Sequence, residues 1–390
     1  MVYITVMQSP RFHQITLDEL LDGIKDTSAF ADYGTSNTRT YVADRVAEKR
    51  LETIDVDSMI ACLREFNQRY AALFEADRKS LYHSFSIPKS SGGLRHIDAP
   101  LPDLMEALRQ LKFIFEERLF ARYHTSAFAY VRRRSTIDAL KKHQQNESRW
   151  FAKLDFSNFF GSTTLEFTIT QLSIIFPFNE ILKQEEGKDH LTQALSLCFL
   201  NGMLPQGTPI SPMMTNLLMI PIDHKICNSL RKYNNNQYVY TRYADDLLIS
   251  SKYSFDPKDI ISFIENVVSG FHAPYTLNAQ KTRYGSRAGS NWNLGVMLNK
   301  DNNITLGHRR IKQLKAMINN FSRDHINDVP WTLYDVQVLN GHINYLKMVE
   351  KEYAIHILSE YGKKYGINIP AVIKAKLKTG SMTDTAAISP

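Results

Sequence analysis

Four consecutive residues, Tyr243-Ala244-Asp245-Asp246, place two carboxylates side by side in the chain. The surrounding run from Gln237 to Ser250 alternates aromatic and β-branched residues and then becomes apolar, which predicts a strand, a tight turn and a second strand. Adjacent carboxylates on a turn repel each other unless a cation lies between them, and a hard divalent metal ion suits such oxygens. Asp is also ordinary in solvated turns, so this motif alone leaves both interpretations open.

A further carboxylate lies far upstream, in a segment of different character. Trp150 to Phe160 reads as an apolar strand that ends on Asp155 and runs into aromatic residues. A buried strand seldom ends on an isolated Asp unless that carboxylate has a partner or a function. Asp155 is too distant in sequence from Asp245 for local structure to join them, so a shared site depends on the fold.

Two basic residues flank a predicted hairpin turn. Residues 85–100 read as two short strands joined by Ser-Ser-Gly-Gly, with Lys89 before the turn and Arg95 after it. A point charge and a guanidinium on such a hairpin suit a triphosphate, although basic residues commonly flank turns.

A turn rich in Gly and Pro, residues 201–212, leads into a predicted helix. Ser211 is the expected N-cap and Pro212 the first helical residue. Conformationally restricted residues at this density are typical of backbone held close to a ligand.

Helical periodicity supplies the elements that must position these segments. Residues 1–80 are predicted to be mostly helical, with the clearest apolar period over 57–74. Further helices are predicted over 104–119, 213–230, 260–271, from 306 onward and over 336–349, and the small polar stretch 374–390 is expected to fray.

The composition is that of a soluble globular protein. The chain has 390 residues, 43% of them apolar and 22% charged, and a net charge of +7, which suits a polyanionic partner. No segment approaches the ~18 uninterrupted apolar residues of a membrane span, and Met1–Met7 lacks the features of a signal peptide. We therefore expect a cytoplasmic protein without membrane association. Its three cysteines are predicted to be core thiols.

In order and spacing, these segments resemble the successive motifs of a bacterial reverse transcriptase, in the style of group II intron, retron and abortive-infection enzymes. The resemblance covers roughly residues 80–350, and the matching stretches are Ile87–Lys89 with Gly93–Arg95, Phe151–Asp155, Leu204–Gly207 with Ser211–Pro212, Tyr243–Asp246, and Lys281–Thr282 followed by Asn293–Gly295. It implies an α+β right-hand polymerase fold with fingers, palm and thumb. The implied domains are a helical N-terminal extension (1–80), fingers and palm (81–300), a helical thumb (301–370) and a flexible tail (371–390).

The resemblance also implies roles for individual residues. Asp155, Asp245 and Asp246 would hold two Mg²⁺ ions, with Mn²⁺ as an alternative, and Lys281 is a candidate general acid, although a surface role suits that lysine equally well. The implied nucleotide pocket consists of Lys89, Arg95, Phe156, Phe160, Gln206 and Tyr243, with Phe160 excluding a 2′-OH. Implied primer and template contacts are Asn293, Leu294, Gly295, Arg309 and Arg310.

The implied activity is RNA-directed DNA synthesis from dNTPs, giving DNA or an RNA/DNA hybrid. Thr136–His143 departs from the retron pattern Asn-Ala-x-x-His, Asn293–Gly295 departs from Val-Thr-Gly, and no endonuclease set of Cys and His residues is evident. We therefore expect a stand-alone, defence-associated enzyme templated by a non-coding RNA, with an oligomer or a companion protein left open. The alternatives are template-independent or protein-primed DNA synthesis, and a non-catalytic RNA-binding scaffold with a polymerase fold.

Overall fold

The computed structural model describes residues 4–8, 11–15, 55–89, 92–119, 121–232, 237–287 and 295–385. The chain divides into two compact units. Unit 1 consists of Met1–Arg134, Ala152–Ile249 and Phe255–Thr282, and unit 2 consists of Ser135–Phe151, Ser250–Ser254 and Arg283–Pro390.

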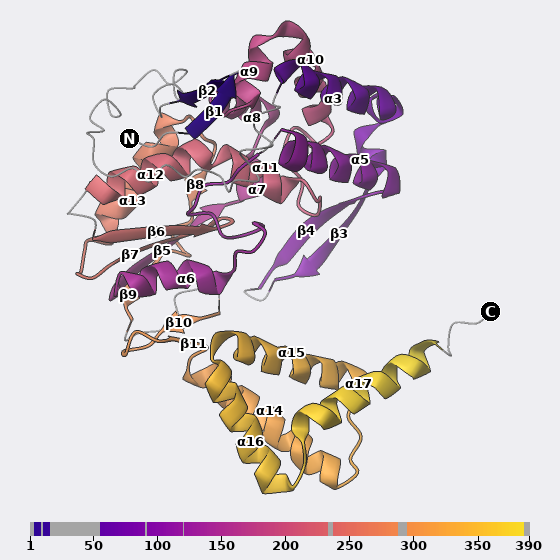
Figure 1. Ribbon diagram of the computed structural model, residues 1–390, viewed down its shortest axis with the longest axis vertical. Coiled ribbons are helices and arrows are strands. Elements are labelled where there is room, and N and C mark those ends of the chain that lie inside the picture. The colour runs from indigo at the N-terminus through magenta and orange to yellow at the C-terminus, as the bar shows by residue number, and fades with distance from the viewer. Residues whose placement is uncertain are drawn as a thin grey trace. The chain divides into compact units, whose positions relative to one another are not determined.

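A five-stranded sheet carries both acidic segments, the strand before Asp155 and the strands around Tyr243–Asp246 (Figure 1). Its order is β6-β7-β5-β8, and β9 pairs with β5. The strands are β5 (Trp150–Ser157), β6 (Tyr238–Tyr243), β7 (Asp246–Ser251), β8 (Thr276–Leu277) and β9 (Arg283–Ser286). Only Ala244 and Asp245 separate β6 from β7, so the predicted strand-turn-strand is confirmed.

Amphipathic helices bury the sheet within unit 1. In α13 (Pro257–Gly270) the buried residues Ile260, Ile264, Val267 and Val268 follow the helical period, which gives one continuous apolar face. Helix α13 contacts α12 (Ile220–Lys232) and β8, and α12 contacts β6. The other helices of unit 1 are α3 (Val56–Arg69), α4 (Ala71–Glu75), η2 (Arg78–Leu81), α5 (Pro102–Phe113), the π-helix η3 (Ile114–Arg118), α7 (Phe159–Ser162), α8 (Leu165–Leu172), α9 (Phe178–Lys183), α10 (Glu185–Ser196) and α11 (Ser211–Leu218).

Two antiparallel hairpins complete unit 1. Strands β3 (Tyr82–Pro88) and β4 (Leu94–Pro100) form the predicted hairpin around Ser-Ser-Gly-Gly, and we call this pair the flap. Strands β1 (Ile4–Gln8) and β2 (Arg11–Ile15) pair near the N-terminus. The expectation that residues 1–80 are mostly helical is confirmed for 57–74, but it is wrong for 4–8 and 11–15, which are strands. Residues 16–54 lie outside the described residues.

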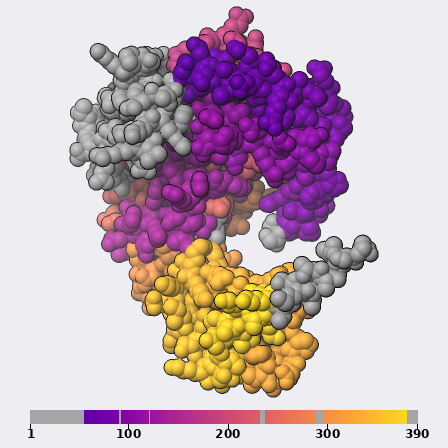
Figure 2. All heavy atoms as spheres, turned by 45° about the vertical axis from the view of Figure 1, so that its right-hand side comes forward, coloured from indigo at the N-terminus to yellow at the C-terminus, as the bar shows by residue number. Residues whose placement is uncertain are grey.

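Unit 2 is dominated by helices. Helices α14 (His308–Ile326), α15 (Leu333–Val349), α16 (Lys351–Tyr365) and α17 (Ile369–Thr385) pack against one another, and Figure 2 shows their atoms in orange to yellow. Helix α6 (Thr136–Gln145) and the short strands β10 (Met297–Leu298) and β11 (Ile304–Thr305) also belong to this unit.

The expected flexible tail is helical over most of its length. Helix α17 buries Ile369 and Ile373, one turn apart, and continues to Thr385, so the expected fraying is wrong for residues 371–385. None of the helices in the described part of the chain is long and apolar enough to cross a membrane.

Candidate active site

The first feature of the site is a backbone junction between two acidic segments. We call residues 243–246 the aspartate turn. The Phe156 amide of β5 donates a hydrogen bond of 3.0 Å to the Asp245 carbonyl. Asp155, the preceding residue of β5, has a side chain only 7% exposed. The fold therefore brings Asp155 beside the aspartate turn, although the two segments are far apart in sequence.

Two lysines contact these carboxylates. Lys281 Nζ donates to Asp155 Oδ2 and Oδ1 at 2.9 and 3.1 Å, and Lys153 Nζ lies 2.9 Å from Asp246 Oδ1. The Asn278 amide donates to the Asp155 carbonyl at 2.7 Å, which holds the turn that carries Lys281. Sequence reasoning missed Lys153, although strand alternation places it on the same face of β5 as Asp155.

Burial or neighbouring groups raise the pKa values of Asp245, Asp246 and Lys281. Burial raises the pKa of Asp245, and the neighbouring charge of Asp155 raises it further. Burial also raises the pKa of Asp246, although Lys153 opposes this shift. The hydrogen bond to Asp155 raises the pKa of Lys281, so this lysine is protonated at neutral pH. The site thus holds three acids whose charge is only partly neutralised.

The donor set fits a hard cation, but the lysines occupy part of it. Carboxylate oxygens in a partly desolvated site are the ligands that Mg²⁺ and Mn²⁺ prefer. As the side chains stand, no three His, Cys, Asp or Glu residues in the described ranges are grouped closely enough to hold a metal ion. Lys281 bonds both oxygens of Asp155 and Lys153 contacts one oxygen of Asp246, so a cation held by Asp155, Asp245 and Asp246 would compete with these lysines.

The flap and the Gly/Pro-rich turn meet in unit 1. The Asp98 amide on β4 donates to the Gln206 carbonyl at 2.7 Å. A Cβ on Gly207 would lie 2.8 Å from the Asp98 carbonyl oxygen, and the φ of Gly207 is +121°, so only glycine fits this approach. Lys89 and Arg95 are exposed on the flap, where the Lys89 amide donates to the Gly93 carbonyl at 2.9 Å.

The predicted cap of α11 is shifted by one residue. Ile210 is the N-cap and Ser211 the first helical residue. The Ser211 hydroxyl donates to the Pro205 carbonyl at 2.9 Å, because it closes the preceding turn instead of capping the helix.

Aromatic residues of the expected nucleotide pocket have different environments. Phe156 is 1% exposed and packs on Phe159 and Tyr275, with ring centroids 5.6 and 5.5 Å away. Its assignment to the pocket is therefore wrong, since strand alternation turns it to the core while Asp155 faces the opposite side. Phe160 and Tyr243 are half-buried, and their pocket roles stay predictions.

The comparisons with known proteins decide the family. Residues 87–310 match the model of the reverse transcriptase (RNA-dependent DNA polymerase) family. This chain is a member of that family. The match runs from the flap to the start of α14, which confirms the predicted α+β polymerase fold and the activity of an RNA-directed DNA polymerase.

Individual relatives are identical to this reverse transcriptase at about a quarter of the aligned positions. It is 25% identical to the retron Ec83 reverse transcriptase of Escherichia coli over 324 residues, covering 80% of this chain and 96% of the relative. It is also 25% identical to the Escherichia coli retron Ec73 reverse transcriptase over 289 residues, covering 72% and 86%. A telomerase structure from Candida albicans, solved with a fragment of telomeric RNA, aligns at 12% identity and a TM-score of 0.42 over 77% of this chain and 61% of that one.

The relatives named above bear on the branch of the family. The departures at Thr136–His143 and Asn293–Gly295 favoured a branch outside the retrons, whereas these relatives are retron reverse transcriptases at 25% identity. The branch to which this chain belongs stays a prediction.

The residues expected to hold primer and template belong to unit 2 or lie outside the described residues. Asn293 and Leu294 fall in the range 288–294, which the structure does not describe. Gly295 accepts a hydrogen bond of 2.7 Å on its carbonyl from Arg310 Nη1, and its φ of +91° favours glycine. Arg310 thus has a partner within the chain, and both Arg309 and Arg310 are exposed. Their contacts with nucleic acid remain predictions.

Proposed function

We propose that this reverse transcriptase performs two-metal nucleotidyl transfer at Asp155, Asp245 and Asp246. The observation that supports this most strongly is the Phe156–Asp245 backbone bond, which places a buried Asp155 beside the aspartate turn. When bound, two divalent ions would activate the primer 3′-OH and neutralise the triphosphate and the leaving pyrophosphate. The protein supplies carboxylates whose mutual repulsion disfavours the ion-free site and therefore favours cation binding.

Lys281 has two roles in this proposal. Without a cation, its ammonium group compensates the buried charge of Asp155. The hydrogen bond to Asp155 raises its pKa and keeps the proton on Nζ while the two are in contact, and a Lys281 released from Asp155 could donate that proton to the pyrophosphate. The exposed half of its side chain leaves it free to make this movement.

We further propose an RNA template that is a non-coding RNA, and a role in antiphage defence in the cytoplasm. The retron relatives and the net charge of +7 support a structured RNA partner. Lys89, Arg95 and Gln206 are proposed to bind the dNTP, because the flap carrying both basic residues is bonded to the Gln206 loop at Asp98.

The test is dNTP incorporation on a primed RNA template by the wild type and by Asp245→Ala with Asp246→Ala. The double variant should lose incorporation while retaining its fold and its RNA affinity. Asp189→Ala, which removes an exposed carboxylate on α10, is the control. Synthesis that survives in the double variant would end the proposal, and incorporation without added RNA would favour template-independent synthesis instead.

A further inference from the structure

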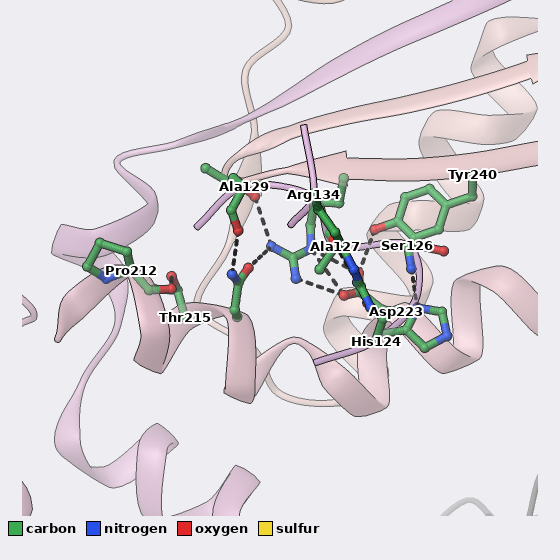
Figure 3. Close-up of polar contacts among 12 residues, drawn as sticks. His124, Ser126, Ala127, Ala129, Arg134, Pro212, Thr215, Asp223 and Tyr240 are labelled. Atoms are coloured by element: carbon green, nitrogen blue, oxygen red, sulfur yellow. Dashed lines mark hydrogen bonds and ion pairs between the residues drawn. The ribbon is translucent and has the colours of Figure 1, made fainter. Parts of the chain in front are cut away.

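A buried ion pair lies directly behind the aspartate turn. Arg242, the residue before the turn, and Asp223 of α12 both have fully buried side chains. Arg242 Nη2 donates to Asp223 Oδ2 at 2.8 Å, and Arg242 Nε donates to Asp223 Oδ1 at 3.0 Å. The hydroxyl of Tyr240 also donates to Asp223 Oδ1, at 2.7 Å, and Figure 3 shows the side chains of Tyr240 and Asp223 next to each other.

Stability alone explains such a pair poorly. Withdrawing two charges from water costs several kcal/mol per ion, and apolar residues of equal volume often serve the fold as well. Burial by itself would lower the pKa of Arg242, but the charge and hydrogen bonds of Asp223, together with Tyr240 and Tyr275, raise the pKa overall, so the guanidinium stays charged. The explanation must therefore include what the remaining donors of Arg242 hold.

Those donors hold the aspartate turn. Arg242 Nη1 donates to the Ala244 carbonyl at 3.1 Å and to Asn216 Oδ1 at 3.0 Å. Ala244 is 7% exposed and has a φ of +58°, the left-handed region that costs a residue with a Cβ about 1 kcal/mol. The guanidinium supplies this strained, buried peptide with the donor that its carbonyl requires.

The same residues fix the backbone on the other side of β6. The Arg242 amide donates to the Ser126 carbonyl at 2.7 Å, and the Phe128 amide donates to the Arg242 carbonyl at 2.9 Å. Asn216 Nδ2 donates to the Ala129 carbonyl at 2.7 Å. The end of β6 is thus held between α11, α12 and the segment 124–130.

We infer that Arg242 is a positioning residue, which fixes the carbonyl of Ala244 and thereby the orientation of the Asp245 carboxylate. Asp223 and Asn216 hold its guanidinium in the plane that reaches Ala244. The aspartate turn is then held from two sides, by Arg242 at Ala244 and by the Phe156 amide at Asp245. This inference rests on the proposed function, because it assumes that Asp245 binds the catalytic cation.

The test compares two substitutions that both remove a bond to Asp223. Arg242→Lys keeps the charge but loses the planar fork that reaches Ala244 and Asn216. Tyr240→Phe removes the 2.7 Å bond to Asp223 and leaves Arg242 in place. Asp223→Asn with Arg242→Gln is a second route, since it loses the fork without leaving an unpaired buried charge.

The first readout is the kinetics of dNTP incorporation. In Arg242→Lys we expect kcat to fall about 100-fold, the effect of a displacement of about 1 Å at a reacting centre, while KM for dNTP changes little. Tyr240→Phe should retain kcat within about twofold, although it loses some stability. The double variant should behave as Arg242→Lys does.

The second readout is hydrogen exchange of the Phe156 amide in the metal-free protein, which reports the turn without any activity. Exchange should accelerate in Arg242→Lys and in the double variant, and stay slow in Tyr240→Phe. Wild-type kcat and a protected Phe156 amide in a folded Arg242→Lys or double variant would overturn the inference. A wild type that incorporates no dNTP would instead defeat the proposed function, and the exchange experiment would still decide whether Arg242 holds the turn.

Discussion

Lys281 donates two hydrogen bonds to the carboxylate of Asp155, at 2.9 and 3.1 Å. The Lys281 side chain is 56% exposed and that of Asp155 only 7%. An ammonium that can leave into solvent thus covers a carboxylate that cannot. This arrangement makes Lys281 a competitor of any cation that binds Asp155.

Replacing Lys281 should therefore strengthen cation binding while it weakens turnover. In Lys281→Met we expect Mn²⁺ affinity to rise about fivefold, because a half-exposed ion pair is worth about 1 kcal/mol. Titration with Mn²⁺ followed by electron paramagnetic resonance measures this affinity. Lys183→Met is the matched control, since Lys183 forms an exposed ion pair with Glu180 at 2.9 Å. Equal Mn²⁺ affinity in wild type and Lys281→Met would show that no competition exists.

The charge of Asp245 should destabilise the metal-free protein at neutral pH. Burial and the charge of Asp155 raise the pKa of Asp245, so the folded state binds its proton more tightly than the unfolded state does. The resulting penalty is complete above the raised pKa and disappears as the pH falls through it. Asp245→Asn should thus stabilise the metal-free protein by about 1 kcal/mol at pH 7 and by nothing at low pH. Urea unfolding in EDTA across pH checks this, and a neutral effect at pH 7 would contradict it.

Phe160 is predicted to select the sugar. Phe160→Ala should reduce the preference for dNTP over rNTP roughly 10- to 100-fold, since removing a ring admits a 2′-OH that the wild type excludes. The ratio of kcat/KM for a matched dNTP and rNTP measures the preference. Phe113→Ala, at an exposed aromatic residue on α5, serves as the control. Unchanged selectivity in Phe160→Ala would place the gate at another residue.

Gly207 should tolerate no side chain. Gly207→Ala combines a φ of +121° with a Cβ 2.8 Å from the Asp98 carbonyl, so we expect a loss of about 1–3 kcal/mol in unfolding free energy and a higher KM for dNTP. Gly270→Ala is the matched control, because its Cβ would meet no atom within 4 Å. Thermal unfolding and steady-state kinetics check both variants. If Gly207→Ala and Gly270→Ala had the same unfolding free energy and the same KM for dNTP, the close approach of Gly207 to the flap would matter for neither stability nor activity.

The local features of the site could be predicted from the sequence because short-range rules govern them. Alternation around Tyr243–Asp246 predicted the hairpin, and the apolar strand before Asp155 predicted β5. The motif order identified the family, which in turn supplied the pairing of Asp155 with Asp245. That pairing depends on β5 lying beside β7, a long-range arrangement that no local rule supplies.

Other features depended on tertiary contacts and were missed. The sequence assigned no role to Arg242, and only its ion pair with Asp223 on α12 shows that this arginine is buried and partnered. Phe156 was assigned to the pocket although it alternates with Asp155 and therefore faces the core. The polar end of the chain continues as helix α17 because Ile369 and Ile373 pack within unit 2.

The bond from the Asp98 amide to the Gln206 carbonyl has a mechanical consequence. Strand β4 carries Arg95 three residues before Asp98, so the arginine proposed to bind the dNTP lies on the strand that is bonded to the Gln206 loop. If the flap swings outward to admit substrate, it must either move the Gln206 loop with it or break the hydrogen bond from the Asp98 amide to the Gln206 carbonyl. Opening of the flap and rearrangement of the Gln206 loop would then occur together.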